Sequence, residues 1–171
     1  MSRILGIDPG SRITGFGVVD VVAGKNLHVE SGTVRPKLES LPERLGELFR
    51  GVREVIAHAA PDQVAVENVF MHRNADSALK LGQARGAIIA AAVESGIPVF
   101  EYTPAEIKQA VVGKGGAAKE QVQHMVRLLL NLGELQADQA DALACALCHA
   151  HHSQGLAAMT GVTQWRRGRA R

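Results

Sequence analysis

Cysteine is scarce in this sequence, and long apolar runs are missing from it. Its 171 residues include two cysteines, and no apolar signal segment stands at the amino terminus. We therefore expect a protein that stays in the cytoplasm, where its thiols are reduced and form no disulfide. The longest apolar run is much shorter than the roughly 20 residues that a helix needs to cross a bilayer, so we expect no membrane contact.

An excess of one charge sign is also lacking. Lysine and arginine number 19 against 17 aspartate and glutamate, a net charge of +2, so overall charge does not indicate a nucleic-acid partner. The basic residues are unevenly placed, since four arginines crowd the carboxyl end. With 46% apolar residues and no low-complexity tract, the chain is typical of one globular domain. We expect that domain to span residues 1–152 and residues 153–171 to form a basic, flexible tail.

The opening third of the chain has the pattern of three strands. Residues 3–8 end at the turn sequence Asp8-Pro9-Gly10-Ser11, residues 13–21 return with partial alternation, and a short turn leads into residues 27–34. Connections of this length permit antiparallel pairing, which predicts a three-stranded meander.

From residue 41 the apolar spacing becomes helical, and strands and helices then alternate. Thr103, followed by Pro104 and Glu106, is a capping sequence that marks one helix start. Glycine lowers helix stability, so for Gly82 and Gly86 we expect compensation by close packing against a neighbour. The expected segments are helices at 41–56, 75–95, 104–112, 117–131 and 137–151 and strands at 63–67 and 97–102. This order predicts an α/β fold, a five-stranded mixed sheet with its first three strands antiparallel and helices on both faces.

Four carboxylates lie in stretches that are otherwise apolar. Asp8 ends the first strand, Glu67 ends the strand at 63–67, and Asp138 and Asp141 are one turn apart on the last helix. A buried carboxylate is costly unless it is paired or binds a cation, and Mg²⁺ prefers oxygen ligands. A helix docked on the sheet would bring the four acids together. Two divalent metals held there could activate a water and stabilise the leaving oxygen of a phosphodiester.

Some of these acids also have a purely structural explanation. Asp8 could stabilise the turn before Pro9, and Asp138 could favour the amino end of its helix through the helix dipole. Asp141 is harder to explain in this way. The joint pattern of four acids favours the metal site.

Long ungapped blocks of the sequence resemble one known family. The blocks are GIDPGSR at 6–12, ENVF at 67–70, NADSALKLGQARG at 74–86, KQAVVG at 108–113, QVQHMVR at 121–127 and ADQADALA at 137–144. In these blocks, and across residues 3–152, the chain resembles the RuvC-type Holliday-junction resolvases.

The resemblance implies an RNase H-like fold, a homodimer and cooperation with the RuvA and RuvB branch-migration motor. It also implies paired, symmetric nicks in four-way DNA junctions during recombination and repair, within short thymine-containing sequences. Asp8, Glu67, Asp138 and Asp141 would be the catalytic acids and the ligands of two Mg²⁺ ions, for which Mn²⁺ could substitute. Relatives often carry alanine where this chain has Gln139, and we expect that side chain to point away from the metals.

Basic and aromatic residues near the acids are the expected DNA contacts. The resemblance implies that Phe70 lies near the scissile bond and that Lys108 and Lys119 contact DNA. We also expect Arg73 and Lys114 to contact DNA. A phenylalanine is usually a core residue, but in a loop beside the acids its ring could stack on an unpaired base. Any one lysine is usually a solvated surface residue, but three around a flexible glycine-rich loop are placed to contact phosphates.

Residues 145–149, CALCH, match the c-type haem attachment pattern, and the nearby histidines also suggest zinc. The acids and the cysteines of this helix follow one stripe, so Cys145 and Cys148 are expected to be small core residues without haem or zinc. The same spacing leaves His149 off that stripe, and we expect it to be exposed to solvent.

Two other functions compete with the nuclease. Residues 6–10 with Gly15 and Gly17 also resemble the first phosphate loop of sugar kinases and actin-like ATPases, but those folds need two lobes and this chain has room for one. A catalytically silent binder of branched DNA is the third possibility, and the intact set of acids argues against it. Incubating a labelled four-way junction with and without Mg²⁺ separates all three.

Overall fold

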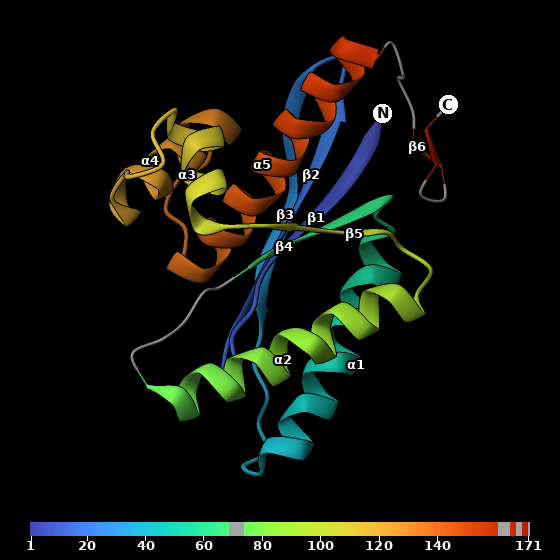
Figure 1. The fold of residues 1–171 in the computed structure, drawn as a ribbon, viewed down its shortest axis with the longest axis vertical. Helices are drawn as coiled ribbons and strands as arrows, with labels where there is room; N and C mark the ends of the chain where they lie inside the picture. The colour runs from blue at the N-terminus through green and yellow to red at the C-terminus, as the bar shows by residue number, and fades with distance from the viewer. Residues whose placement is uncertain (69–73, 161–164, 167–168, 171) are drawn as a thin grey trace.

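The chain forms one five-stranded sheet with helices on both faces (Figure 1). The computed structural model describes residues 1–68, 74–160, 165–166 and 169–170. The predicted α/β architecture is confirmed. The elements are β1 (Ser2–Asp8), β2 (Thr14–Val22), β3 (Lys25–Val34), α1 (Leu41–Ala59), β4 (Gln63–Glu67), α2 (Ala75–Glu94), β5 (Val99–Tyr102), α3 (Pro104–Val112), α4 (Lys119–Leu130), α5 (Ala137–Thr160) and the small hairpin β6 (Trp165–Arg166) and β7 (Arg169–Ala170).

β1 is the middle strand of the sheet, whose order is β3-β2-β1-β4-β5. Short turns make β1, β2 and β3 an antiparallel meander, whereas β4 pairs parallel to β1 and β5 parallel to β4. Because the carboxyl ends of parallel strands meet at one edge, the last residues of β1 and β4 lie side by side. The register pairs Ile7 with Val66, which makes Asp8 and Glu67 neighbours at that edge.

Alternate side chains of the central strands enter two separate cores. Leu5 and Ile7 pack with α1 and α2 on one face, whereas Ile4 packs with α3, α4 and α5 on the other. Asp8 has the same parity as Ile4, so its side chain belongs to the face that α5 covers. Figure 1 shows α1 and α2 on one side of the sheet and α5 on the other.

Glycines let α5 lie directly on the sheet backbone. A methyl group at Gly6 would overlap the carbonyl oxygen of Ala142, and one at Gly15 would overlap that of Asp138. The sheet therefore has no side chain at the points where α5 crosses β1 and β2. This close approach places the first turn of α5 at the edge where β1 ends. Docking of this helix on the sheet was expected, but the part played by the glycines was not.

One expectation about the helices was wrong, because the last helix ends at Thr160 rather than at residue 151. At Gly82 and Gly86 an added methyl group would meet nothing within 4 Å among the described residues, so no neighbour within this part of the chain packs closely there. In the described part of the chain no helix combines the length and the apolar character that a membrane crossing requires.

Candidate functional site

Three of the four predicted acids line one cavity. Asp8 from β1, Glu67 from β4 and Asp141 from α5 face a cavity of about 430 Å³ at the carboxyl edge of the central strands. The parallel pairing of β1 with β4 and the docking of α5 on glycine bring these distant residues together. We call this cavity the acid cleft.

The acid cleft holds more negative charge than its surroundings neutralise. Burial, the charges of Glu67 and Asp141, and a hydrogen bond with Glu67 raise the pKa of Asp8 to about 8. Burial also raises the pKa of Glu67, although the hydrogen bond with Asp8 and the charges of Lys119 and Lys108 oppose that rise. A carboxyl group that holds its proton near neutral pH, as Asp8 does, is typical of a functional site and suits one that awaits a cation.

A lysine supplies part of the missing positive charge. Lys119, the first residue of α4, places its Nζ 2.6 Å from Oδ2 of Asp141. The hydrogen bond to Asp141 raises the pKa of Lys119, so this ammonium is protonated. Lys108 of α3 also lines the acid cleft.

Asp138 lies beside the acid cleft but does not line it. It is half-buried in the first turn of α5, and its charge contributes to the raised pKa of Asp8. As they are placed, no three acidic, histidine or cysteine side chains within the described residues lie close enough to hold one ion. The chemistry of the donors nevertheless fits Mg²⁺, because three carboxylates line one cleft, a fourth lies beside it, and Asp8 keeps its proton.

The predicted DNA contacts have different positions. Lys108 and Lys119 line the acid cleft, whereas Lys114 is exposed in the loop between α3 and α4 and is not part of its lining. Phe70 and Arg73 lie outside the described residues. Their roles stay predictions.

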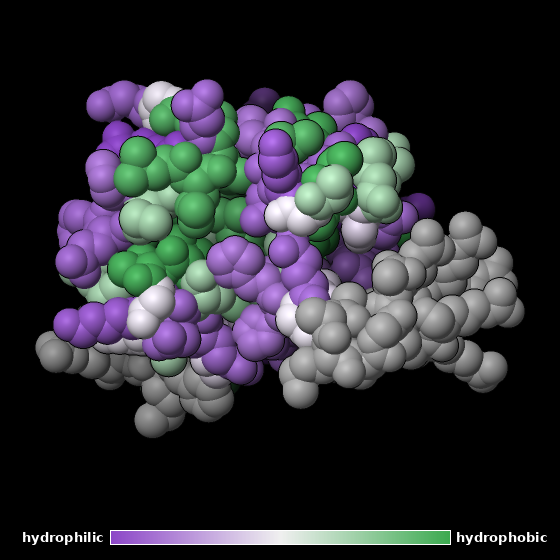
Figure 2. Space-filling view, turned by 90° about the horizontal axis from the view of Figure 1, so that it is seen from above, coloured by the Kyte–Doolittle hydropathy of each residue, from purple (hydrophilic) through white to green (hydrophobic). Residues whose placement is uncertain are grey.

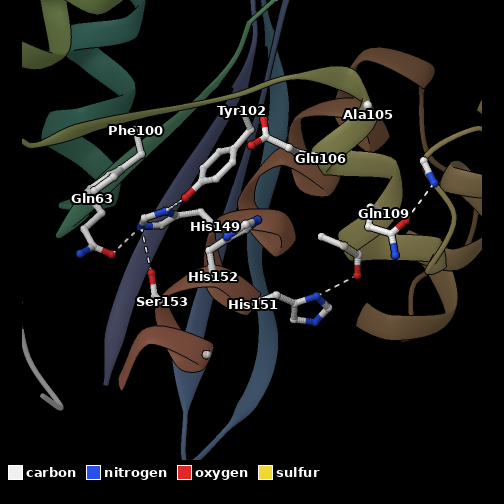
Figure 3. A pocket seen from close by; sticks show the side chains of 13 residues that line it. Gln63, Phe100, Tyr102, Ala105, Glu106, Gln109, His149, His151, His152 and Ser153 are labelled. Carbon is white, nitrogen blue, oxygen red and sulfur yellow. Dashed lines mark hydrogen bonds between the residues drawn. The ribbon is translucent and has the colours of Figure 1, made fainter. Parts of the chain in front are cut away.

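The expectation for His149 was wrong, since its side chain is 2% exposed. Its Nδ1 pairs with the hydroxyl of Tyr102 at 2.7 Å, and its Nε2 lies 2.8 Å from Oε1 of Gln63 and 3.3 Å from Oγ of Ser153 (Figure 3). Its ring stacks on Phe100 at 4.4 Å. Burial lowers the pKa of His149 to about 4, so the ring is neutral.

This histidine lines a second cavity of about 910 Å³ between β5, α3 and α5. From above, an apolar hollow faces the reader on the side of the molecule where α3 and α4 lie (Figure 2). The cavity is larger than the acid cleft, but among the described residues Glu106 is its only acid, and the thiols of Cys145 and Cys148 are buried nearby, as expected. A mostly apolar cavity without a cluster of carboxylates among the described residues is a poor place for metal-dependent phosphodiester chemistry, so the acid cleft is the candidate nuclease site.

An acidic cleft on the middle strand of a sheet in the order β3-β2-β1-β4-β5 defines an RNase H-like protein. Residues 4–149 match the family "Crossover junction endodeoxyribonuclease RuvC". The chain belongs to this family of nucleases.

Its relatives cover almost the whole chain. A protein of this name from Aeromonas salmonicida (strain A449) is 59% identical over 173 residues, 100% of both chains. Another, from Aeromonas hydrophila subsp. hydrophila, is 61% identical over 162 residues, 94% of each chain. The structure of Thermus thermophilus RuvC in complex with Holliday junction substrate is 42% identical, with a TM-score of 0.84, and the match covers 91% of this chain and 96% of that one.

Proposed function

We propose that this protein resolves four-way DNA junctions by paired, symmetric, metal-dependent nicks during homologous recombination and DNA repair. The observation that carries the proposal is the acid cleft, in which Asp8, Glu67 and Asp141 converge beside Lys108 and Lys119. Family membership and the junction-bound Thermus thermophilus relative support the same substrate. A cytoplasmic location is part of the proposal.

Asp8, Glu67, Asp138 and Asp141 would hold the metal, which we propose to be two Mg²⁺ ions that Mn²⁺ can replace. Bound Mg²⁺ would lower the pKa of a water and stabilise negative charge at the phosphodiester. Asp8, on the middle strand, is placed between Glu67 of β4 and the two acids of α5, so it is the residue best placed to be shared. Without metal, Lys119 neutralises Asp141 and a proton neutralises Asp8.

The lysines would position the DNA. Lys108 and Lys119 reach the acid cleft from α3 and α4, so a phosphate that approaches the acids meets two ammonium groups first. Lys114, Phe70 and Arg73 are proposed as further contacts, the lysine and arginine with phosphates and the ring with an unpaired base.

We further propose a homodimer that uses one face of α2. Along this helix the exposed residues include Leu79, Gly82, Gly86 and Val93, which recur at spacings of three, four and seven. Leu79 is 68% exposed and Val93 61% exposed, and the two glycines leave open space beside them. An uncharged, small-residue stripe of this kind suits close approach of a second helix, and a two-fold pair would place two nicks symmetrically. Cooperation with RuvA and RuvB is proposed on family membership alone.

Incubation with a labelled four-way junction tests the function. In Mg²⁺ the protein should cut the junction at two symmetric positions. In EDTA it should bind the same junction without cutting it. A shifted, uncut band in Mg²⁺ would instead favour a silent DNA binder, and nucleotide turnover without cleavage would favour an actin-like protein.

A further inference from the structure

A basic pocket lies next to the acid cleft. It has a volume of about 260 Å³ and lies where β1 and β3 end and α1 begins, at the edge of the sheet that also carries Asp8. Its charged lining consists of four cations and one acid, namely Arg12, Arg35, Lys37, Arg44 and Glu39.

These cations lack acidic partners. Within the described residues, no ion pair involves any of the four. Among the described residues, Arg35 donates hydrogen bonds to neutral oxygens alone, Oγ1 of Thr33 at 3.1 Å and Oε1 of Gln136 at 3.3 Å. The Nε of Arg44 is buried and has no hydrogen-bond partner among the described residues. A buried guanidinium N–H without an acceptor is costly, so the pocket is built for an anion that completes it.

Glu47 of α1 already has hydrogen-bond partners in the segment that lines the pocket. Glu47 accepts hydrogen bonds from the backbone N–H groups of Lys37 at 2.8 Å and Leu38 at 2.9 Å. Its charge therefore holds the segment after β3 in place instead of neutralising the arginines. The lining of the pocket is fixed before any anion arrives, which lowers the entropy cost of binding.

One loop separates the basic pocket from the acid cleft. Pro9 and Gly10 of the β1–β2 loop line the acid cleft, whereas Arg12 and Ile13 of the same loop line the basic pocket. The hydroxyl of Thr14 binds the N–H and the carbonyl of Gly10, at 3.2 and 2.9 Å, and so fixes the loop. A ligand that fills both sites must cross this loop, as an extended chain of phosphates could.

We propose that the basic pocket binds a backbone phosphate of the DNA substrate, on the side of the acid cleft away from Lys108 and Lys119. The inference rests on the proposed function, because it assumes a DNA substrate. Guanidinium groups match the geometry of phosphate oxygens, and the pocket has room for a single phosphate group. The cleaved strand is then held on both sides of the acids.

Binding measured in EDTA tests this inference without cleavage. Arg44→Gln and Arg12→Gln should each weaken junction binding on the order of tenfold and lower the slope of log Kd against log salt concentration by about 0.9, the value for one phosphate contact. Arg50→Gln is the matched control, since Arg50 is an exposed arginine of α1 outside the pocket. It should bind like the wild type.

Junctions with single neutral methylphosphonate linkages identify the phosphate. At one position the neutral linkage should lower the affinity of the wild type for the junction. It should not lower the affinity of Arg44→Gln further, because this variant has already lost its contact with that phosphate. If both proteins lose affinity equally at every position, the inference is wrong. Arg12→Gln, at an exposed residue, replaces Arg44→Gln in this comparison if the latter melts at a lower temperature than the wild type.

Wild-type cleavage separates the two proposals. Suppose that the wild type cuts junctions in Mg²⁺ and that the folded arginine variants bind junctions as tightly as the wild type, with the same salt slope. The proposed phosphate pocket is then wrong, whereas the proposed nuclease function stands. A wild type that does not cut junctions would contradict the proposed function itself.

Discussion

Asp8 is half-buried and His149 is buried, and loss of solvent contact moves their pKa values in opposite directions because it disfavours the charged form of each. The pKa of Asp8 rises to about 8, and that of His149 falls to about 4. Both groups are thus neutral in the metal-free protein at pH 7. Only Asp8 lies among other carboxylates, so only its neutrality prepares a cation site.

The metal-free protein should lose stability as the pH rises from 6.5 to 8. Folded Asp8 keeps its proton up to about pH 8, whereas the unfolded side chain releases it near 3.8, so unfolding releases a proton in this range and is favoured by higher pH. His149 opposes this trend only between its folded pKa of about 4 and the ordinary histidine pKa of 6.5. Melting temperatures in EDTA should therefore fall across this window for the wild type and much less for Asp8→Asn. If the melting temperatures of the wild type and of Asp8→Asn change with pH in the same way, Asp8 is ionised in the folded protein.

Tyr102→Phe should destabilise the fold without affecting the acid cleft. The change removes the hydroxyl that pairs with Nδ1 of His149 at 2.7 Å and leaves a buried ring nitrogen without a partner. The free energy of unfolding should fall by about 1–3 kcal/mol in a urea titration. Junction cleavage at a temperature where the variant is folded should keep its rate. An unchanged unfolding midpoint would indicate that water replaces the hydroxyl through the cavity.

Lys108→Gln and Lys119→Gln should flatten the salt dependence of junction binding, each by about one phosphate contact. Lys119→Gln should also raise the pKa of Glu67, because its positive charge lowers that pKa. Lys25→Gln, at an exposed residue at the start of β3, is the matched control. If both variants show the same salt dependence of junction binding as the wild type, Lys108 and Lys119 do not contact the DNA.

His149 shows why some residues could not be placed from the sequence. The two cysteines were correctly expected in the core, because their spacing matches that of the acids. The same reasoning assumed one buried stripe, but every residue from 142 to 150 is buried, between the sheet on one side and α3 and α4 on the other. A helix enclosed all round has no exposed face for His149, and only the tertiary arrangement reveals this.

At the scale of elements, α2 leaves an apolar stripe uncovered. Its buried side, with Ala84, Ile88 and Ala91, packs against the core that it shares with α1. Its outer stripe is apolar or glycine although it faces solvent in a single chain. Exposed apolar stripes of this kind mark association surfaces.

Gly86→Glu on this stripe should produce a monomer that folds at least as well as the wild type. A Cβ atom added at Gly86 meets nothing within 4 Å among the described residues of one chain, and replacing glycine favours the helix, whereas a buried charge would oppose a helix–helix contact. Sedimentation at micromolar concentration should show a wild-type dimer and a Gly86→Glu monomer. Ala57→Glu, on the exposed side of α1, should stay dimeric. A monomeric wild type that still cuts both strands in concert would contradict the dimer.

Local signals account for most of the elements. The capping box at Thr103 and Glu106 forms as predicted, and the turn after Asp8 gives the antiparallel pairing of β1 and β2. The end of α5 could not be predicted, because the polar residues after 151 resemble a helix end. The roles of Gly6 and Gly15 were also missed, since close approach of α5 depends on how distant segments pack.

Across the whole molecule, a net charge of +2 conceals an ordered distribution. Asp8, Glu67 and Asp141 concentrate negative charge at one edge of the sheet, with Lys108 and Lys119 inside the acid cleft and the basic pocket beyond the β1–β2 loop. A polyanion is attracted by the flanking cations and held over the acids. Sequence counts cannot reveal such an arrangement, because the topology brings these residues together.

The central claim is that the acid cleft performs metal-dependent cleavage of four-way junctions. Binding in EDTA and single-turnover cleavage in Mg²⁺, measured on one preparation of wild type, Asp8→Asn and Glu67→Gln, test it most directly. Both variants should bind junctions as the wild type does, while cleavage falls by about a thousandfold or more, since losing a metal ligand removes several kcal/mol of transition-state stabilisation. Wild-type cleavage rates in the two folded variants would contradict the assignment of the acid cleft as the active site.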